Sequence, residues 1–236
     1  MKGKSISSQL KKYAAISSLT LISTNAYSTI VTIDFEGHGY SIYQNGGSIT
    51  ELSGATLTTS DSLSGSITYD TNGTYTHFTT FADWTQNYYD TTIAVNATFS
   101  GVNGSTSLAY SGNGQAMVEE NPNPAWTTLR FFSQENSPSS SGAWQLQFDS
   151  IRFQGDLTPF GPGSPPPIPD SFDWDGSYNA TTHFDIDLLN TETNETATLR
   201  ARLTSFETVS QVPVPAAAWL FGSAIIGLFG FKRKLS

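Results

Sequence analysis

The sequence contains no cysteine among its 236 residues. This absence excludes disulfide bonds, thiolate metal sites and cysteine nucleophiles, and it also excludes the lipid-modified cysteine of a bacterial lipoprotein. The stability of the folded part must therefore come from burial and hydrogen bonding.

Lysine is absent from the whole interior of the chain. Between Tyr13 and Phe231 the only bases are four arginines, whereas all 20 acidic residues lie in this interval, which gives a formal charge of 4 − 20 = −16. Such a surface repels phosphate backbones, so we expect no nucleic-acid binding. It suits a soluble extracellular domain. The four arginines are Arg130, Arg152, Arg200 and Arg202.

A long apolar segment with the 3.6-residue period of a helix is also lacking between residues 29 and 211. Short runs of alternating apolar and polar residues recur instead, separated by turn residues. This pattern predicts an all-β domain, most simply an antiparallel two-sheet sandwich of jelly-roll type. The expected strands are 30–35, 66–70, 74–78, 91–99, 126–132, 144–153, 183–189 and 197–206.

Three local features refine this prediction. Thr71-Asn72-Gly73 predicts a hairpin turn, because Asn-Gly accepts positive φ. The apolar phase changes within 144–153, which predicts a bulge near Asp149-Ser150. The loop 157–170 contains six prolines and should be an extended, unpaired connector. The roughly 40 residues after it are too few for a core of their own, so they should pair back into a single domain at 29–211.

The N-terminal segment 1–28 has the three zones of a secretory signal peptide. Four lysines precede a short apolar stretch at 13–22, and small residues follow at a spacing that predicts cleavage after Ser28 or after Ala26. The apolar stretch is well short of the roughly 20 residues that cross a bilayer. We therefore expect export.

The C-terminal segment 212–236 has three parts in a fixed order. The motif Val212-Pro213-Val214-Pro215-Ala216 leads into an uncharged run that ends at Phe231, and Lys232-Arg233-Lys234 follows directly. This predicts a transmembrane helix at 214–231 whose basic end stays on the cytoplasmic side.

This tail resembles the PEP-CTERM sorting domain in its VPxPA variant, in which a short proline motif, an apolar span and a basic cluster follow one another. Val214 stands where the commonest form of the motif has glutamate. The resemblance implies recognition by an exosortase, an integral-membrane enzyme, at the inner membrane of a Gram-negative bacterium. It further implies release or transfer to the cell surface and association with exopolysaccharide or biofilm.

Two clusters could bind a metal ion. Asp34 and Glu36 alternate on one strand face, and with Asp149 they are candidate oxygen ligands for Ca²⁺. This arrangement is faintly similar to the structural calcium site of carbohydrate-binding jelly rolls. His183, Asp185 and Asp187 also alternate, but the apolar residues of the opposite face favour a half-buried strand as the explanation.

Catalytic signatures are scarce. The sequence has no G-x-S-x-G elbow, no H-E-x-x-H motif and no phosphate-binding loop, and it has only three histidines. We therefore expect a non-enzymatic surface or matrix protein, anchored in the inner membrane and then moved to the cell surface or outside. One alternative is a calcium-stabilised carbohydrate-binding module that binds extracellular polysaccharide through a planar patch of exposed tryptophan or tyrosine side chains. The other is a secreted hydrolase with a pair of carboxylates.

Overall fold

The computed structural model describes residues 29–81, 84–122, 125–135, 138–155, 166–170 and 182–213. This part of the chain contains eleven β-strands and no helix. The strands are β1 (Thr29–Gln44), β2 (Gly47–Ile49), β3 (Ser62–Asp70), β4 (Thr74–Thr80), β5 (Thr85–Gly101), β6 (Gly104–Pro122), β7 (Ala125–Ser133), β8 (Ser139–Ser141), β9 (Trp144–Gly155), β10 (His183–Asn190) and β11 (Thr196–Pro213).

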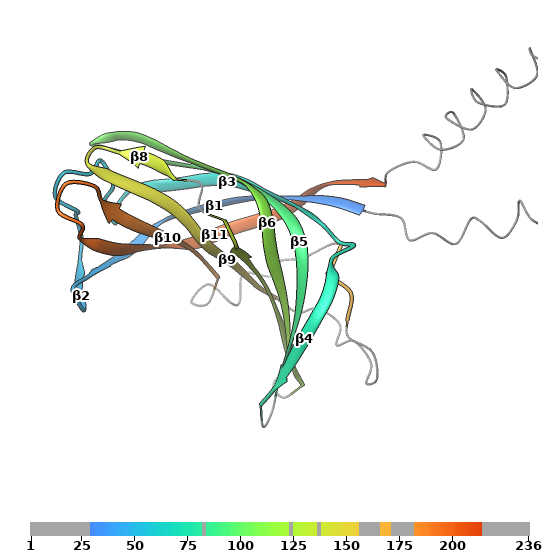
Figure 1. Ribbon diagram of the computed structural model, residues 1–236. Coiled ribbons are helices and arrows are strands. Elements are labelled where there is room, and N and C mark those ends of the chain that lie inside the picture. The colour runs from blue at the N-terminus through green and yellow to red at the C-terminus, as the bar shows by residue number, and fades with distance from the viewer. Residues whose placement is uncertain are drawn as a thin grey trace, which may run out of the picture.

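The principal strands close into a single antiparallel barrel (Figure 1). They hydrogen-bond in the order β10–β11–β1–β3–β5–β6–β7–β9, and β9 pairs again with β10. The predicted two-sheet, jelly-roll-like sandwich is therefore wrong, because stacked sheets would leave free edges that this ring does not have. Alternation identifies the buried face of each strand, and that face is the same in a sandwich and in a small barrel.

The expected transmembrane helix at 214–231 and the signal peptide at 1–28 lie outside the described residues. In the part that is described, there is no helix of the length and apolarity needed to cross a membrane.

The barrel interior is packed with the apolar side chains that alternation predicts. Phe184 of β10 is fully buried, and its ring centroid lies 5.5 Å from those of Phe35 on β1 and Phe148 on β9, and 6.3 Å from that of Phe99 on β5. Because these strands lie on different sides of the barrel, the ring of Phe184 packs against side chains from several walls at once. Burying such a ring contributes about 2–3 kcal/mol.

The predicted hairpin at Thr71-Asn72-Gly73 is wrong. The strands on either side of it, β3 and β4, do not pair with each other in the described part of the chain; both pair with β5, β3 along Ile93–Ser100 and β4 along Thr85–Asp90. The turn is thus a corner from one half of β5 to the other. A Cβ at Gly73 would lie 2.6 Å from Cδ1 of Ile168, so this glycine allows close packing of another segment.

The predicted bulge in β9 is confirmed. Asp185 of β10 lies opposite Ser150, but the next residue of β10, Ile186, lies opposite Phe148. Asp149 is therefore the extra residue, and the shift restores the inward direction of Ile151 and Phe153.

The described end of the proline-rich loop, 166–170, lies against the core. Ile168 is buried, Tyr69 Oη donates a hydrogen bond to the Pro169 carbonyl oxygen at 2.8 Å, and Tyr89 Oη donates one to that of Pro166. The segment belongs to no strand, as expected. It is nevertheless anchored inside the fold.

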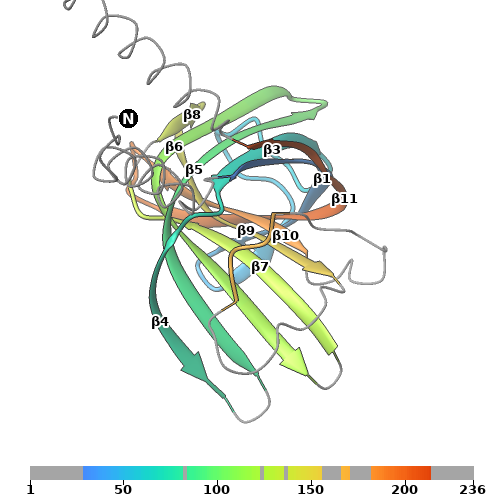
Figure 2. The same cartoon turned by 90° about the vertical axis from the view of Figure 1, so that its right-hand side faces the viewer.

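The two ends of the described chain lie side by side (Figure 1), because Thr29 of β1 is the register partner of Pro213 of β11. β4 projects away from the strands around β1 and β3 (Figure 2). The wall of the barrel is continued there by the far ends of β5 and β6, which pair along their whole lengths.

Candidate functional site

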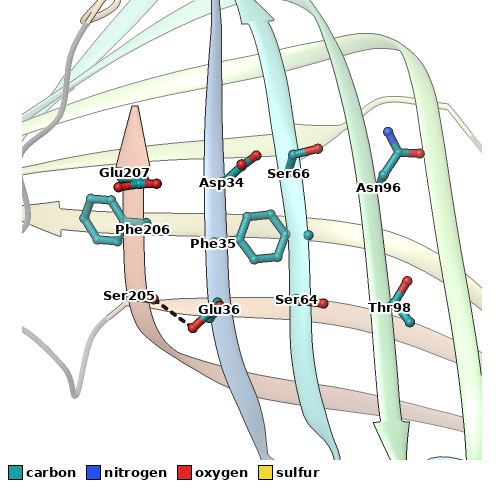
Figure 3. Close-up of a pocket in the computed structure, with 11 residues that line it drawn as sticks. Asp34, Phe35, Glu36, Ser64, Ser66, Asn96, Thr98, Ser205, Phe206 and Glu207 are labelled. Carbon is teal, nitrogen blue, oxygen red and sulfur yellow. Dashed lines mark hydrogen bonds between the residues drawn. The ribbon is translucent and has the colours of Figure 1, made fainter. Parts of the chain in front are cut away.

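Two predicted calcium ligands lie on the outer wall of the barrel. Asp34 and Glu36 project from β1, and Glu207 of β11 is the register partner of Asp34. Figure 3 shows the three carboxylates on one side, Asn96 and Thr98 of β5 on the other, and β3 between them. These residues line a shallow groove of about 610 Å³. Ser205 Oγ lies 3.5 Å from Glu36 Oε2, at the limit of a hydrogen bond.

The third predicted ligand, Asp149, is not brought to this groove. It lies on β9, and the strands β10 and β11 separate it from Asp34 and Glu36 on β1. No group of three His, Asp or Glu side chains arranged to hold a metal ion occurs among the residues that the structure describes. A calcium site on Asp34 and Glu36 stays a prediction without Asp149 as its partner.

The second predicted cluster is the centre of an ionic network on another part of the outer wall. Asp185 is only 2% exposed, and Arg200 donates to both of its carboxylate oxygens, from Nε at 2.9 Å and from Nη2 at 3.3 Å. Nε2 of His183 lies 3.2 Å from Asp185 Oδ2, and Nη2 of Arg130 lies 4.0 Å from the same oxygen. Asp187, the third member of the cluster, is exposed and accepts a hydrogen bond from Thr198.

Burial and pairing act in opposite directions on the two neighbouring carboxylates. Burial alone would raise the pKa of Asp185, but the hydrogen bonds and charges of His183 and Arg200 outweigh it and hold this pKa below its usual range. Burial and the charge of Asp187 raise the pKa of Asp149 above its usual range.

Opposed pKa values of this kind characterise an acid–base pair in a hydrolase. Here, however, both oxygens of Asp185 are already bound by Arg200, and the side chain is almost completely buried. A substrate could not reach it without breaking this ion pair. The Asp149–Asp185 pair therefore fits a structural role better than a catalytic one.

All four arginines of the domain lie on this same side of the barrel. Arg130 on β7 is the register partner of Arg152 on β9, which is opposite His183 on β10, which in turn is opposite Arg202 on β11. We call the set Arg130, Arg152, His183, Arg200 and Arg202 the arginine face. It extends across four neighbouring strands.

The arginine face continues into a second shallow groove, of about 600 Å³. Thr198 precedes Arg200 by two residues on β11, and it lines this groove with Gln145 and Gln147 of β9. Tyr43 of β1 forms the opposite side and is 45% exposed. The groove thus combines amide groups, a hydroxyl, the exposed carboxylate of Asp187 and an accessible aromatic ring.

The predicted processing residues are placed only in part. Val212 and Pro213 form the end of β11, opposite Ile30 and Thr29. The others lie outside the described residues: Ala26, Ser28, Val214, Pro215, Ala216, Lys232, Arg233 and Lys234.

The arginine face was not predicted from the sequence. Each arginine lies between apolar residues, as in Leu129-Arg130-Phe131, so alternation could have assigned all four to the outer wall. The four arginines come together only because of which strands are neighbours in the barrel, and the sequence around each arginine does not contain that information. No protein-family model, curated protein or solved structure matches this chain.

Proposed function

We propose that this chain is an exported surface or extracellular-matrix protein that an exosortase-type enzyme sorts at the inner membrane. The observation that carries the proposal is the order of features in 212–236: a proline motif, an uncharged run and a basic cluster, beginning where the last strand ends. Each part has a physical role in membrane sorting, since the apolar run favours the bilayer and the basic cluster favours its cytoplasmic side.

The distribution of charge supports export. The barrel region has no lysine and a large excess of acids, whereas the leader and the tail carry seven of the 11 basic residues.

The fold is compatible with processing at both ends. Thr29 and Pro213 are register partners, so the leader and the tail join the barrel at the same end. In the part of the chain that the structure describes, the barrel closes between these residues and its buried core extends from Val31 to Phe206.

The test follows the full-length chain in a Gram-negative host that carries an exosortase and in the same host without that enzyme. We expect surface or medium localisation and a shortened chain, by fractionation and intact-mass spectrometry, only where the enzyme is present. The triple variant Lys232→Gln, Arg233→Gln, Lys234→Gln should reduce correct sorting because it removes the cytoplasmic anchor.

The matched control is Glu192→Gln with Glu195→Gln, in the exposed turn between β10 and β11. It changes surface charge without touching the tail and should be sorted normally. Recovery of the unprocessed wild-type chain from the cytosol of the host that carries the enzyme would overturn the proposal. Identical processing in the two hosts would do the same.

A further inference from the structure

The arginine face is a concentration of positive charge on a strongly acidic molecule. The barrel region has only four bases against 20 acids, yet all four lie on β7, β9 and β11, with His183 between them on β10. Neighbouring strands are about 4.8 Å apart, so the row from Arg130 to Arg202 spans roughly 14 Å.

This arrangement costs stability. Like charges directly opposite each other on neighbouring strands are destabilising, and Arg130 lies opposite Arg152. The Nε atoms of both arginines are buried without a hydrogen-bond partner. Burial also lowers the pKa of Arg152, with Glu119 acting against this and the neighbouring arginines adding to it. A row retained at such a cost suggests a use beyond folding.

The acids nearby pair with three of the four arginines. Asp185 forms ion pairs with Arg200 and, at 4.0 Å, with Arg130, and Glu119 forms one with Arg152 at 3.7 Å. Among the described residues no carboxylate forms an ion pair with Arg202, whose guanidinium carbon lies 4.3 Å from the centre of the Tyr40 ring. Since guanidinium groups have five N–H donors, most of those on Arg202 can bind a ligand.

The residues around the row from Arg130 to Arg202 favour a ligand whose anionic groups are attached to sugars. Tyr40 and Tyr43 are 51% and 45% exposed, so their rings are accessible for stacking. The adjoining groove contains Gln145, Gln147, Thr198 and the exposed Asp187, whose polar atoms can form hydrogen bonds with the hydroxyl groups of a neighbouring sugar. A single small anion would use only one or two of the aligned cations.

We propose that the arginine face binds an acidic, carboxylate-bearing polysaccharide, with one carboxylate on Arg202, others beside the partly exposed guanidinium groups of Arg130 and Arg152, and neighbouring sugars against Tyr43 and the groove. This deepens the proposed function and rests on it for the extracellular setting in which such a polymer occurs. Guanidinium–carboxylate pairs are charge-assisted and directional, so the alignment of the row also orients the polymer across the strands.

The test measures binding of polygalacturonate, a carboxylate-bearing polysaccharide, to the full-length chain in a non-ionic detergent at low and at high salt. Wild type should bind, and the affinity should fall as sodium chloride rises, because exposed charges are screened. Arg202→Gln should weaken binding about five- to tenfold, since it removes charge-assisted hydrogen bonds. This residue pairs with no carboxylate among the described residues, so its replacement loses only the cation–π contact with Tyr40 and should lower the thermal unfolding temperature by no more than about 4 °C.

Two variants serve as controls. Thr98→Asp makes the molecule equally more negative, but on the wall of Figure 3, and should leave binding nearly unchanged. Tyr43→Ala should weaken binding of polygalacturonate while leaving any binding of inorganic polyphosphate unaltered. Neutral dextran should bind far less than the acidic polymer.

Three outcomes would overturn the inference: no binding of polygalacturonate at low salt, an equal loss with Thr98→Asp, or equal binding of polyphosphate with the same variant profile. The last result would mean a general anion site. An exported chain that fails to bind contradicts this inference alone, whereas a chain that binds but stays in the cytosol contradicts the proposed function alone.

Discussion

At the scale of single residues, Asp185 shows how a buried carboxylate is stabilised on the outer wall of the barrel. Its carboxylate is nearly inaccessible to water, and such burial is tolerated because Arg200 and His183 supply hydrogen bonds and positive charge. Arg200 is partly exposed and can turn to solvent if its partner is lost. The pair therefore stabilises the fold less than a fully enclosed one would.

We expect Asp185→Asn to lower the free energy of unfolding at pH 7 by about 2–3 kcal/mol, because removing one partner of a buried pair leaves the others unpaired. The pKa of Asp185 is lowered in the folded state, so its contribution is present above the ordinary carboxylate pKa of about 4 and is lost as the pH falls below it. Urea unfolding at pH 7 and pH 3, monitored by tryptophan fluorescence, measures the difference, which should shrink at pH 3.

The matched control for that experiment is Asp187→Asn, two residues further along the same face and exposed. Its effect should stay within about 0.5 kcal/mol, as is usual for surface positions. Equal losses for the two variants, or a difference that does not depend on pH, would contradict the role assigned to Asp185.

At the scale of elements, two of the four Asn-Gly pairs behave differently. Asn45 and Gly46 have positive φ angles of 52° and 78° and connect β1 to β2 as a tight hairpin. Asn72-Gly73 makes a corner instead, because Ile168 and β5 occupy the space beside Gly73. The same dipeptide thus follows local preference in one place and tertiary packing in the other.

The segment 166–170 is held against the core by hydrogen bonds from Tyr69 and Tyr89. Tyr69→Phe should lower the free energy of unfolding by about 1–2 kcal/mol, because the buried Pro169 carbonyl oxygen loses its donor while the ring keeps its packing against Phe131. Limited proteolysis within 157–170 should also become faster. Tyr75→Phe, on an exposed side chain of β4, is the control and should change neither measurement.

At the scale of the whole molecule, β10 closes the barrel. Asp187 is the register partner of Gln147 on one side and of Thr198 on the other. Antiparallel neighbours have Cα atoms about 4.5–5.5 Å apart, which lies within the range that a disulfide bridges.

The chain has no native cysteine, so paired substitutions give an unambiguous test of closure. Asp187→Cys combined with Gln147→Cys, and Asp187→Cys combined with Thr198→Cys, should each form an intramolecular disulfide, detected by mass and by mobility without reductant. Asp187→Cys with Ser66→Cys, on the wall of Figure 3, should keep two free thiols. Cross-linking on only one side of β10 would mean an open sheet.

The sequence by itself determined the properties that have a short range along the chain. Alternation predicted the strands and their buried faces, and the phase change predicted the bulge at Asp149, because side-chain direction in a strand depends only on neighbouring residues. It did not predict the three-residue strands β2 and β8, nor β6, whose three glycines and polar residues lack clear alternation and which is held by its long pairing with β5.

Only the tertiary structure decided how these strands meet. Arg130 and Arg202 are 72 positions apart in the sequence, and they share one face because β9 and β10 lie between their strands. Closure of the barrel, the ion pair at Asp185 and the separation of Asp149 from Asp34 have the same origin. Pairing between strands depends on register and edges across the whole chain, and a period of two residues contains no information about which edges will join.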